Sequence, residues 1–155
     1  MDRARRRIAV SGRRKPSKRK PIDLTAAIEA ARRARASAHA PYSGYRVGAA
    51  VVTASGRVYA GCNVENATFG ATICAERSAV CAMVAAGERK PIACVVVTPA
   101  PTPGTPCGIC RQVLAEFADD MPLLLLAEDD AGAIVRRASA KLRALFPHSF
   151  RLRSI

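Results

Sequence analysis

The sequence predicts an α/β fold, a three-layer α/β/α sandwich around a mixed five-stranded sheet. Apolar, strand-like segments alternate with helical segments along the chain, which is the pattern of a layered α/β domain. Connections through helices make neighbouring strands parallel, whereas two tight turns require antiparallel pairs, so the sheet is mixed. With 155 residues, half of them hydrophobic, the chain has the size of one domain.

The first helix is expected to run from Asp23, a suitable N-cap, to about Ala38. A loop with Pro and Gly at 40–44 follows it. Two strands are then expected at 47–53 and 58–63. The four residues between these strands include a Gly and form a short turn, so the pair is a hairpin.

A second helix is expected at 73–86, where Gly87 ends it. The run 92–98 is rich in β-branched residues and bounded by prolines, a pattern typical of a strand buried on both faces. A loop stiffened by four prolines follows at 99–106.

The third helix is expected at 107–118 and a second buried strand at 123–127. A turn at 129–132, with two Asp and a Gly, leads into a short strand at 134–137. A last helix is expected at 138–145. No repeat or second domain is expected.

A basic tail, residues 1–22, precedes the domain, which is expected at 23–155. The first twenty residues contain ten of the 25 Lys and Arg and one of the 12 acidic residues, so nine of the thirteen net positive charges lie there. We interpret the tail as solvated and disordered. A nucleic-acid or membrane contact, an organelle transit peptide and a misplaced translation start are the alternatives.

The longest strongly apolar run, at 121–127, has seven residues, whereas a membrane-spanning helix needs roughly 20, so a soluble protein without a membrane partner is expected. Six cysteines without an export signal favour a reducing compartment. We therefore expect a cytoplasmic protein whose cysteines are buried, catalytic or metal-bound.

The cysteine spacing predicts a metal site. Cys107 and Cys110 have the C-x-x-C spacing that lets two thiolates bind one ion, and Cys74 opens the preceding helix. Both turns before these helices face the same end of the sheet, and helix N-termini stabilise thiolates. Three cysteines leave a tetrahedral Zn²⁺ ion one open position, which indicates catalysis. The alternatives are core cysteines or a closed site with a fourth cysteine, for which Cys62 is a weak candidate.

Two further cysteines are not expected to be ligands. Cys81 lies about 10 Å along the helix from Cys74, too far to share an ion. Cys94 lies among valines in a predicted buried strand and is expected in the core.

Glu76 stands two residues after a candidate ligand, in the first turn of the second helix. Its carboxylate could reach the open coordination position without being a ligand, accept a proton from water and pass it to a leaving group. Arg77 would offset the negative charge of three thiolates. By themselves, these residues would be interpreted as a helix-terminal acid and a surface arginine.

The segments CAER at 74–77 and PCGICRQ at 106–112 resemble the signature of zinc nucleoside and nucleobase deaminases, with Cys in place of its His ligand. Blocks that occur in the same order in the small homotetrameric cytidine deaminases are PYS, VGAA, NVENA and LFPHSF, at 41–43, 47–50, 63–67 and 145–150. The chain is therefore similar to that family over about residues 23–151.

This resemblance implies hydrolytic deamination of cytidine and 2′-deoxycytidine to the uridine nucleosides, a pyrimidine salvage reaction, by a homotetramer with one Zn²⁺ per chain and no organic cofactor. Cys74, Cys107 and Cys110 would be the zinc ligands, and Glu76 the proton shuttle. Arg77 would balance charge near the metal.

The resemblance also implies substrate contacts. Asn63 and Glu65 would hydrogen-bond the ribose 3′-hydroxyl, and Tyr45 would stand beside the nucleoside, where the family usually has Phe. Phe150 corresponds to an aromatic residue that a neighbouring subunit lays over the pyrimidine. Phe69 replaces a more usual tyrosine. Without the resemblance, Asn63 and Glu65 would be the polar end of a strand and Phe150 a core residue.

Three other functions compete with this hypothesis. The first is deamination of another cytosine nucleoside, such as an aminoacylated antibiotic. The second is nucleic-acid editing, with the basic tail holding a polynucleotide. The third is a zinc-stabilised binding module without activity, which the open coordination position and Glu76 disfavour.

Overall fold

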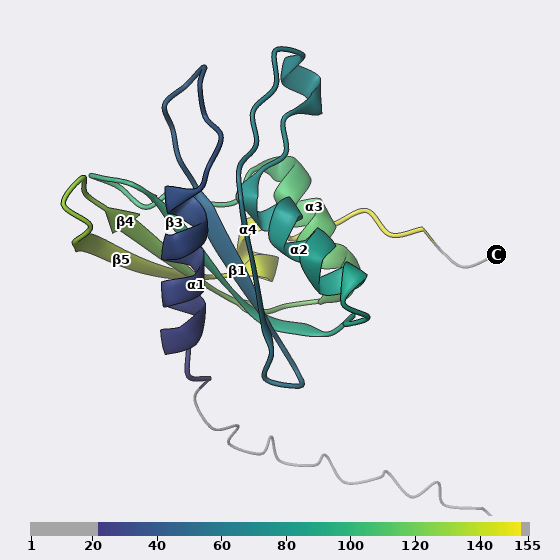
Figure 1. The fold of residues 1–155 in the computed structure, drawn as a ribbon. Coiled ribbons are helices and arrows are strands. Elements are labelled where there is room, and N and C mark those ends of the chain that lie inside the picture. The colour runs from purple at the N-terminus through teal and green to yellow at the C-terminus, as the bar shows by residue number, and fades with distance from the viewer. Residues whose placement is uncertain (1–21, 153–155) are drawn as a thin grey trace, which may run out of the picture.

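The computed structural model describes residues 22–152, so the predicted tail lies outside the described residues except for Ile22. It confirms the three-layer sandwich (Figure 1). No helix within 22–152 is long and apolar enough to cross a membrane. The strands are β1 (Gly48–Thr53), β2 (Val58–Cys62), β3 (Pro91–Pro99), β4 (Pro122–Glu128) and β5 (Ile134–Lys141). The helices are α1 (Thr25–Ala36), the short 3₁₀ helix η1 (Phe69–Ala71), α2 (Ala75–Ala85), α3 (Gly108–Phe117) and α4 (Leu142–Leu145).

The five strands form a mixed sheet, as predicted, and their order in the sheet is β2-β1-β3-β4-β5. β1 pairs antiparallel with β2 and with β3, and β4 pairs antiparallel with β5. β3 and β4 are parallel because the chain returns through α3 between them. Their carboxyl ends therefore lie at the same edge of the sheet, and the loop from β3 to α3 starts there.

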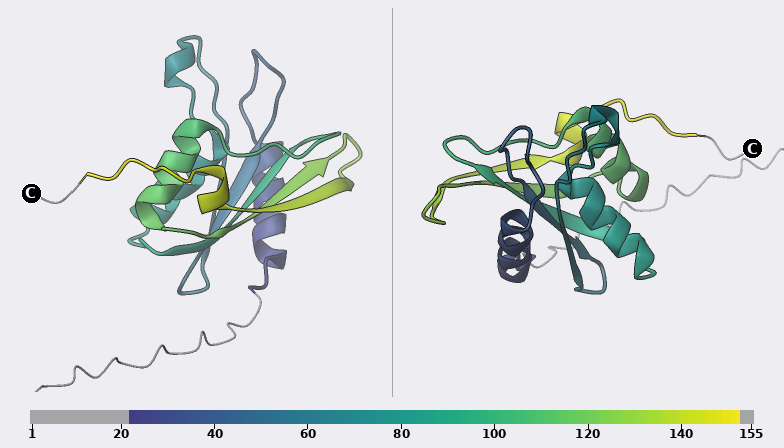
Figure 2. Two further views of the ribbon diagram at one scale, coloured as in Figure 1. Left: turned by 180° about the vertical axis from the view of Figure 1, so that it is seen from behind. Right: turned by 45° about the horizontal axis from the view of Figure 1, so that its top comes forward.

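Helix α1 covers one face of the sheet, and α2 and α3 cover the other (Figure 2). Successive residues of a strand point to opposite faces. In β1, Ala50 and Val52 pack on the α1 side, whereas Ala49 and Val51 pack on the α2 side. Since both faces are covered, all six residues of β1 are buried, which explains the uninterrupted apolar character of the central strands.

Two glycines let helices approach the sheet closely. A Cβ on Gly48 would lie 1.9 Å from the carbonyl oxygen of Ala31 in α1. A Cβ on Gly61 would lie 2.5 Å from the backbone nitrogen of Ala79 in α2. Any side chain at either position would displace a helix, so these glycines set how close α1 and α2 lie to the hairpin.

Two helices begin later than predicted. Helix α1 begins at Thr25, so Asp23 is not its N-cap, but the Asp23 carboxylate accepts hydrogen bonds from the Thr25 N–H and hydroxyl at 2.9 and 2.7 Å. Helix α2 begins at Ala75 rather than at 73, because Ile73 forms an isolated β-bridge with Val64.

The carboxyl-terminal elements differ most from the prediction. β5 continues to Lys141 instead of ending at 137, and α4 contains only four residues. Alanines at 138 and 140 favour a helix locally. Their pairing with β4, which extends to Lys141 opposite Pro122, overrides that preference because it supplies the backbone hydrogen bonds of the edge strand.

Candidate metal centre and substrate pocket

The amino termini of α2 and α3 meet at one edge of the sheet (Figure 1). Cys74 is the N-cap of α2 and Cys107 the N-cap of α3, and both residues are extended. The Cys107 sulfur accepts the Cys110 N–H at 3.5 Å and thereby caps α3. Residues far apart in the sequence thus converge where two helix ends favour negative charge.

Cys74, Cys107 and Cys110 have the spacing of ligands to a tetrahedral zinc ion. The Cys107 Sγ lies 3.7 Å from that of Cys74 and 3.4 Å from that of Cys110. Zn–S bonds of about 2.3 Å at tetrahedral angles require sulfur–sulfur distances of about 3.8 Å. Among residues 22–152, this is the only group of at least three His, Cys, Asp or Glu residues whose ligand atoms converge in this way.

Electrostatic contacts favour a thiolate at Cys74. The pKa of its thiol is lowered to about 5, mainly because the Cys110 thiol donates a hydrogen bond to it, with a further contribution from Arg77. The same contact raises the pKa of Cys110, since a donating thiol must keep its proton. Arg77 donates from Nη2 to the Thr72 carbonyl at 2.6 Å and to the Cys74 Sγ at 3.7 Å. Its guanidinium therefore lies against the Cys74 thiol.

The other cysteines remain outside this group. Cys94 is completely buried in β3, and Cys81 is exposed on α2. The Cys62 thiol donates to the Ser37 carbonyl at 3.7 Å. The structure therefore favours a three-cysteine site over a closed four-cysteine site.

A cavity of about 210 Å³ opens beside the three cysteines. Its walls come from the loop before β1, the loop after β2, the start of α2, the end of β3 and the loop before α3. Glu76, in the first turn of α2, lines the cavity with only 5% of its surface exposed, and this burial raises the pKa of its carboxyl above the usual value. The predicted site residues that line the cavity are Tyr45, Asn63, Glu65, Cys74, Glu76 and Cys107.

Asn63 organises the start of β1 as well as lining the cavity. Its Oδ1 accepts the Val47 N–H at 2.8 Å, and its Nδ2 donates to the Tyr45 carbonyl at 2.9 Å. An amide of this kind has two donor hydrogens and two acceptor lone pairs, so one of each stays available to a ligand.

Glu65 holds the loop that precedes β1. Its carboxylate accepts the Ser43 hydroxyl, the Tyr42 N–H at 2.9 Å and the Ser43 N–H at 3.2 Å. These hydrogen bonds, the Ser43 hydroxyl contributing most, lower the pKa of Glu65. At the tip of the neighbouring loop, Phe69 packs edge-on against Tyr42 with ring centroids 5.9 Å apart.

Phe150 does not line the cavity. Its side chain is exposed, with 70% of the residue's surface accessible, so its interpretation as a core residue is wrong. Gln112 of α3 holds its backbone through two hydrogen bonds: Nε2 donates to the Phe150 carbonyl at 2.8 Å, and Oε1 accepts the Phe150 N–H at 3.0 Å. Helix α3 therefore anchors a segment that presents an aromatic ring at the surface.

The proline-rich loop contributes to the cavity in a way that the sequence analysis missed. Gly104 and Thr105 line the cavity together with Thr98 at the end of β3, and the Gly104 N–H donates to the Thr98 hydroxyl at 2.9 Å. A Cβ on Gly104 would lie 3.0 Å from the Tyr45 hydroxyl oxygen. The C-x-x-C motif that follows could have indicated this role of Gly104 and Thr105, since residues that precede a metal ligand often line the same site.

Comparison with known proteins identifies relatives of this architecture. Residues 22–124 match the family described as the cytidine and deoxycytidylate deaminase zinc-binding region. A cytidine deaminase of Sporosarcina psychrophila is 43% identical over 105 residues, which cover 67% of this chain and 77% of that protein. The crystal structure of a cytidine deaminase from Burkholderia pseudomallei has a TM-score of 0.71 and 42% identity and covers 81% of this chain and 97% of that one. A cytidine deaminase structure from Mycobacterium tuberculosis has a TM-score of 0.69 and 39% identity. The match covers 85% of this chain and 100% of that one.

Proposed function

This chain belongs to the cytidine and deoxycytidylate deaminase family, and we propose that it hydrolyses cytidine and 2′-deoxycytidine to the corresponding uridine nucleosides and ammonia. The observation that carries the proposal is that the buried Glu76 lines the same cavity as Cys74 and Cys107, two members of the three-thiol group with zinc spacing. A zinc site with three protein ligands keeps a position for a reactant, which a structural site lacks. The reaction is one of pyrimidine salvage.

Cys74, Cys107 and Cys110 hold the zinc ion in this proposal. A bound Zn²⁺ ion supplies Lewis acidity, which makes water a competent nucleophile near neutral pH. The Arg77 guanidinium, in contact with the Cys74 sulfur, offsets part of the negative charge of the thiolates.

Glu76 moves the protons of the reaction. Its carboxylate accepts a proton as water adds to C4 of the cytosine ring, protonates N3, and later helps to transfer a proton to the departing amine. The products are the uridine nucleoside and ammonia, so the two hydrogens and one oxygen of the water are all accounted for. The buried position of Glu76 excludes bulk water that would otherwise compete for these protons.

Asn63 and Glu65 bind the ribose 3′-hydroxyl, and Tyr45 packs beside the nucleoside. Three arguments support these roles: all three residues line the cavity, Asn63 retains one donor and one acceptor, and the Glu65 carboxylate is held in place by the Tyr42–Ser43 backbone. A substrate whose 3′-hydroxyl donates to Glu65 must have that hydroxyl free, so a polynucleotide chain could not continue from the 3′ position.

A 3′-phosphate on the nucleoside should therefore slow its turnover strongly. It removes the hydroxyl donor and brings an anion against the Glu65 carboxylate, and this repulsion is stronger in a cavity than in water. We expect efficient turnover of cytidine, poor turnover of 3′-cytidine monophosphate and none of a single-stranded oligonucleotide. The Glu65→Gln variant should partly relieve the 3′-phosphate penalty.

Loss of cytidine absorbance, measured with purified zinc-loaded protein, tests both the function and its competitors. Absence of cytidine turnover at full zinc content would contradict the proposed function and leave another cytosine nucleoside or a binding module. Deamination of the oligonucleotide at a rate near that of cytidine would establish nucleic-acid editing instead.

A homotetramer completes the site in this proposal. Phe150, held by Gln112 but exposed, would cover the pyrimidine in a neighbouring subunit's cavity. Further large apolar side chains, Tyr42, Phe69 and Ile109, are exposed around the cavity edge and on α3, and an assembly would bury them. The thiolate-ligated metal site favours a reducing compartment, so we place the protein in the cytoplasm.

Replacing Phe150 with Ala should weaken cytidine binding, raising KM about fivefold or more, because stacking on a base is worth roughly 1–3 kcal/mol. Zinc content should not change. Leu152→Ala is the matched control, since Leu152 is an exposed apolar residue of the same segment, and its KM should equal that of the wild type. Equal KM values for both variants would remove Phe150 from the substrate site.

A further inference from the structure

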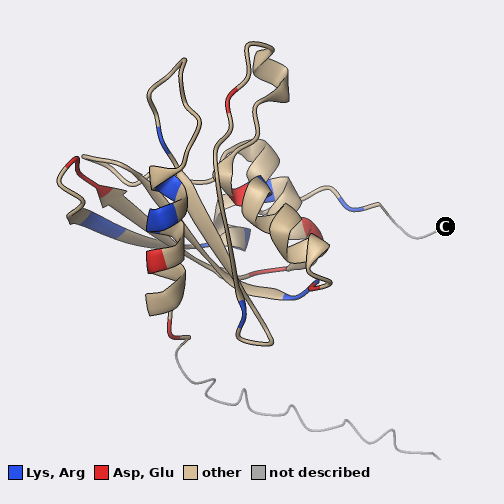
Figure 3. Ribbon diagram, viewed as in Figure 1, with Lys and Arg blue, Asp and Glu red and all other residues tan. Residues whose placement is uncertain are grey.

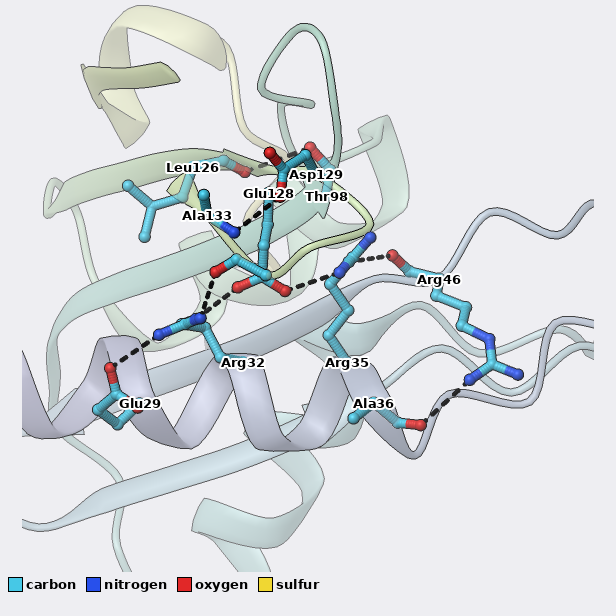
Figure 4. A network of polar contacts seen from close by, with 11 residues as sticks. Glu29, Arg32, Arg35, Ala36, Arg46, Thr98, Leu126, Glu128, Asp129 and Ala133 are labelled. Atoms are coloured by element: carbon cyan, nitrogen blue, oxygen red, sulfur yellow. Dashed lines mark hydrogen bonds and ion pairs between the residues drawn. The ribbon is translucent and has the colours of Figure 1, made fainter. Parts of the chain in front are cut away.

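A buried carboxylate outside the cavity connects two of the cavity walls. Glu128, the last residue of β4, is only 6% exposed. Its carboxylate accepts hydrogen bonds from two arginines of α1, from the Arg32 Nε and, at 2.7 Å, from the Arg35 Nη1 (Figure 4). Figure 3 shows this acidic end of β4 opposite the basic half of α1. Two guanidinium groups thus compensate one buried negative charge.

Arg35 extends this ion pair to the loop before β1. Its Nε donates to the Arg46 carbonyl at 3.2 Å, and Arg46 in turn donates from Nη1 to the Ala36 carbonyl at 3.2 Å (Figure 4). Gly48 makes this approach possible, because a Cβ there would lie 2.6 Å from the Arg35 backbone nitrogen. Helix α1 and the loop are therefore tied together in both directions.

The hydrogen bond to Arg46 lies between two cavity residues. Tyr45 and Val47 line the cavity on either side of Arg46, and Asn63 holds the Tyr45 carbonyl and the Val47 N–H. Arg35 hydrogen-bonds the Arg46 carbonyl between them. The backbone of these three successive residues is therefore held by α1 on one side and by Asn63 on the other.

The main chain of Glu128 holds the opposite wall. Its carbonyl accepts the Ala100 N–H at 3.0 Å, at the start of the loop that leads to Gly104 and Cys107. The two walls meet where the Tyr45 hydroxyl approaches Gly104. Glu128, at the end of β4, is thus linked to both walls of the cavity.

We propose that Arg35, oriented by Glu128, is a positioning residue that fixes Tyr45 against the nucleoside. The proposal rests on the proposed function, since it assigns Tyr45 a substrate to contact. Arg35 does not line the cavity, so it acts only through the Arg46 carbonyl. Without this hydrogen bond, the Arg46 carbonyl is no longer held by α1, and only the contact from the Arg46 guanidinium to the Ala36 carbonyl still ties the loop to that helix. The Tyr45 ring is then held less firmly against the nucleoside.

Arg32 offers a matched control. Arg35→Met and Arg32→Met each leave Glu128 with one guanidinium, but Arg32 bonds the Gly132 carbonyl instead of the loop at Arg46. For Arg35→Met we expect KM for cytidine to rise about 3- to 10-fold, the effect of one lost hydrogen bond, with kcat and zinc content little changed. For Arg32→Met we expect wild-type KM and kcat, with a lower Tm.

Two further variants make the test independent of folding. Arg35→Lys keeps a charge opposite Glu128 but has one nitrogen in place of the two that bond Glu128 and Arg46, so KM should rise while Tm stays near that of the wild type. In a Tyr45→Ala background, Arg35→Met should raise KM no further, because the residue through which it acts is gone.

The outcomes separate this inference from the proposed function. A wild-type protein without cytidine turnover would contradict the function. An active wild type combined with equal KM values for Arg35→Met and Arg32→Met would overturn the role of Arg35 alone. If Arg35→Met does not fold, a wild-type KM for Arg35→Lys overturns it equally, as does a full additional KM increase in the Tyr45→Ala background.

Discussion

Replacing Glu76 with Gln should reduce cytidine turnover to below about 1% of the wild-type rate, because removal of a general acid–base group typically costs a factor of 10² to 10⁴. The amide has the shape of the carboxyl group but can neither accept nor return the proton. Since Glu76 is not a ligand in our proposal, about one zinc per chain should remain. The fold should also remain, because the substitution leaves the buried volume nearly unchanged.

Steady-state kinetics, metal analysis and thermal unfolding on the same preparation test this expectation. Glu116→Gln is the control: Glu116 is an exposed carboxylate on α3, and its neutralisation should leave kcat and KM at wild-type values. Activity of Glu76→Gln above about 1% with a full zinc complement would show that another group moves the protons.

Replacing Cys110 with Ala should remove zinc, activity and much of the stability together. The three thiols connect the starts of α2 and α3, so the free energy of metal binding is also free energy of folding. We expect less than about a tenth of a zinc per chain, activity below about 1%, and a Tm that a chelator no longer lowers.

Cys94→Ala separates metal loss from simple loss of packing. Cys94 and Cys110 are both completely buried, so each substitution removes one buried sulfur atom. Cys94 lies outside the three-cysteine group, and its variant should keep zinc and activity with a modest decrease in Tm. A folded Cys110→Ala protein that binds one zinc per chain would contradict the proposed ligand set.

The elements were predictable where the signal was local. Apolar β-branched runs with prolines at their ends identified β3, and a turn with Gly identified the β1–β2 hairpin. The three cysteines could be placed together because strand-to-helix turns of an α/β sheet face one edge. The boundary between β5 and α4 was missed because residues 138–141 gain their backbone hydrogen bonds from β4, which lies elsewhere in the sequence.

The sequence by itself determined the fold class, the three-cysteine group and the acid two residues after Cys74. The fold class and the acid depend on residue type and local pattern, and the cysteine group depends on the C-x-x-C spacing together with the common edge that strand-to-helix turns face. Only the tertiary structure decided that Asn63 and Glu65 also hold the loop before β1, that Phe150 is exposed, and that Glu128 is linked to Arg35 across 93 residues. A hydrogen bond between side chains so far apart leaves no periodicity or spacing in the sequence. It exists because the packing of α1 against the sheet brings the end of β4 and the last turns of that helix to the same place.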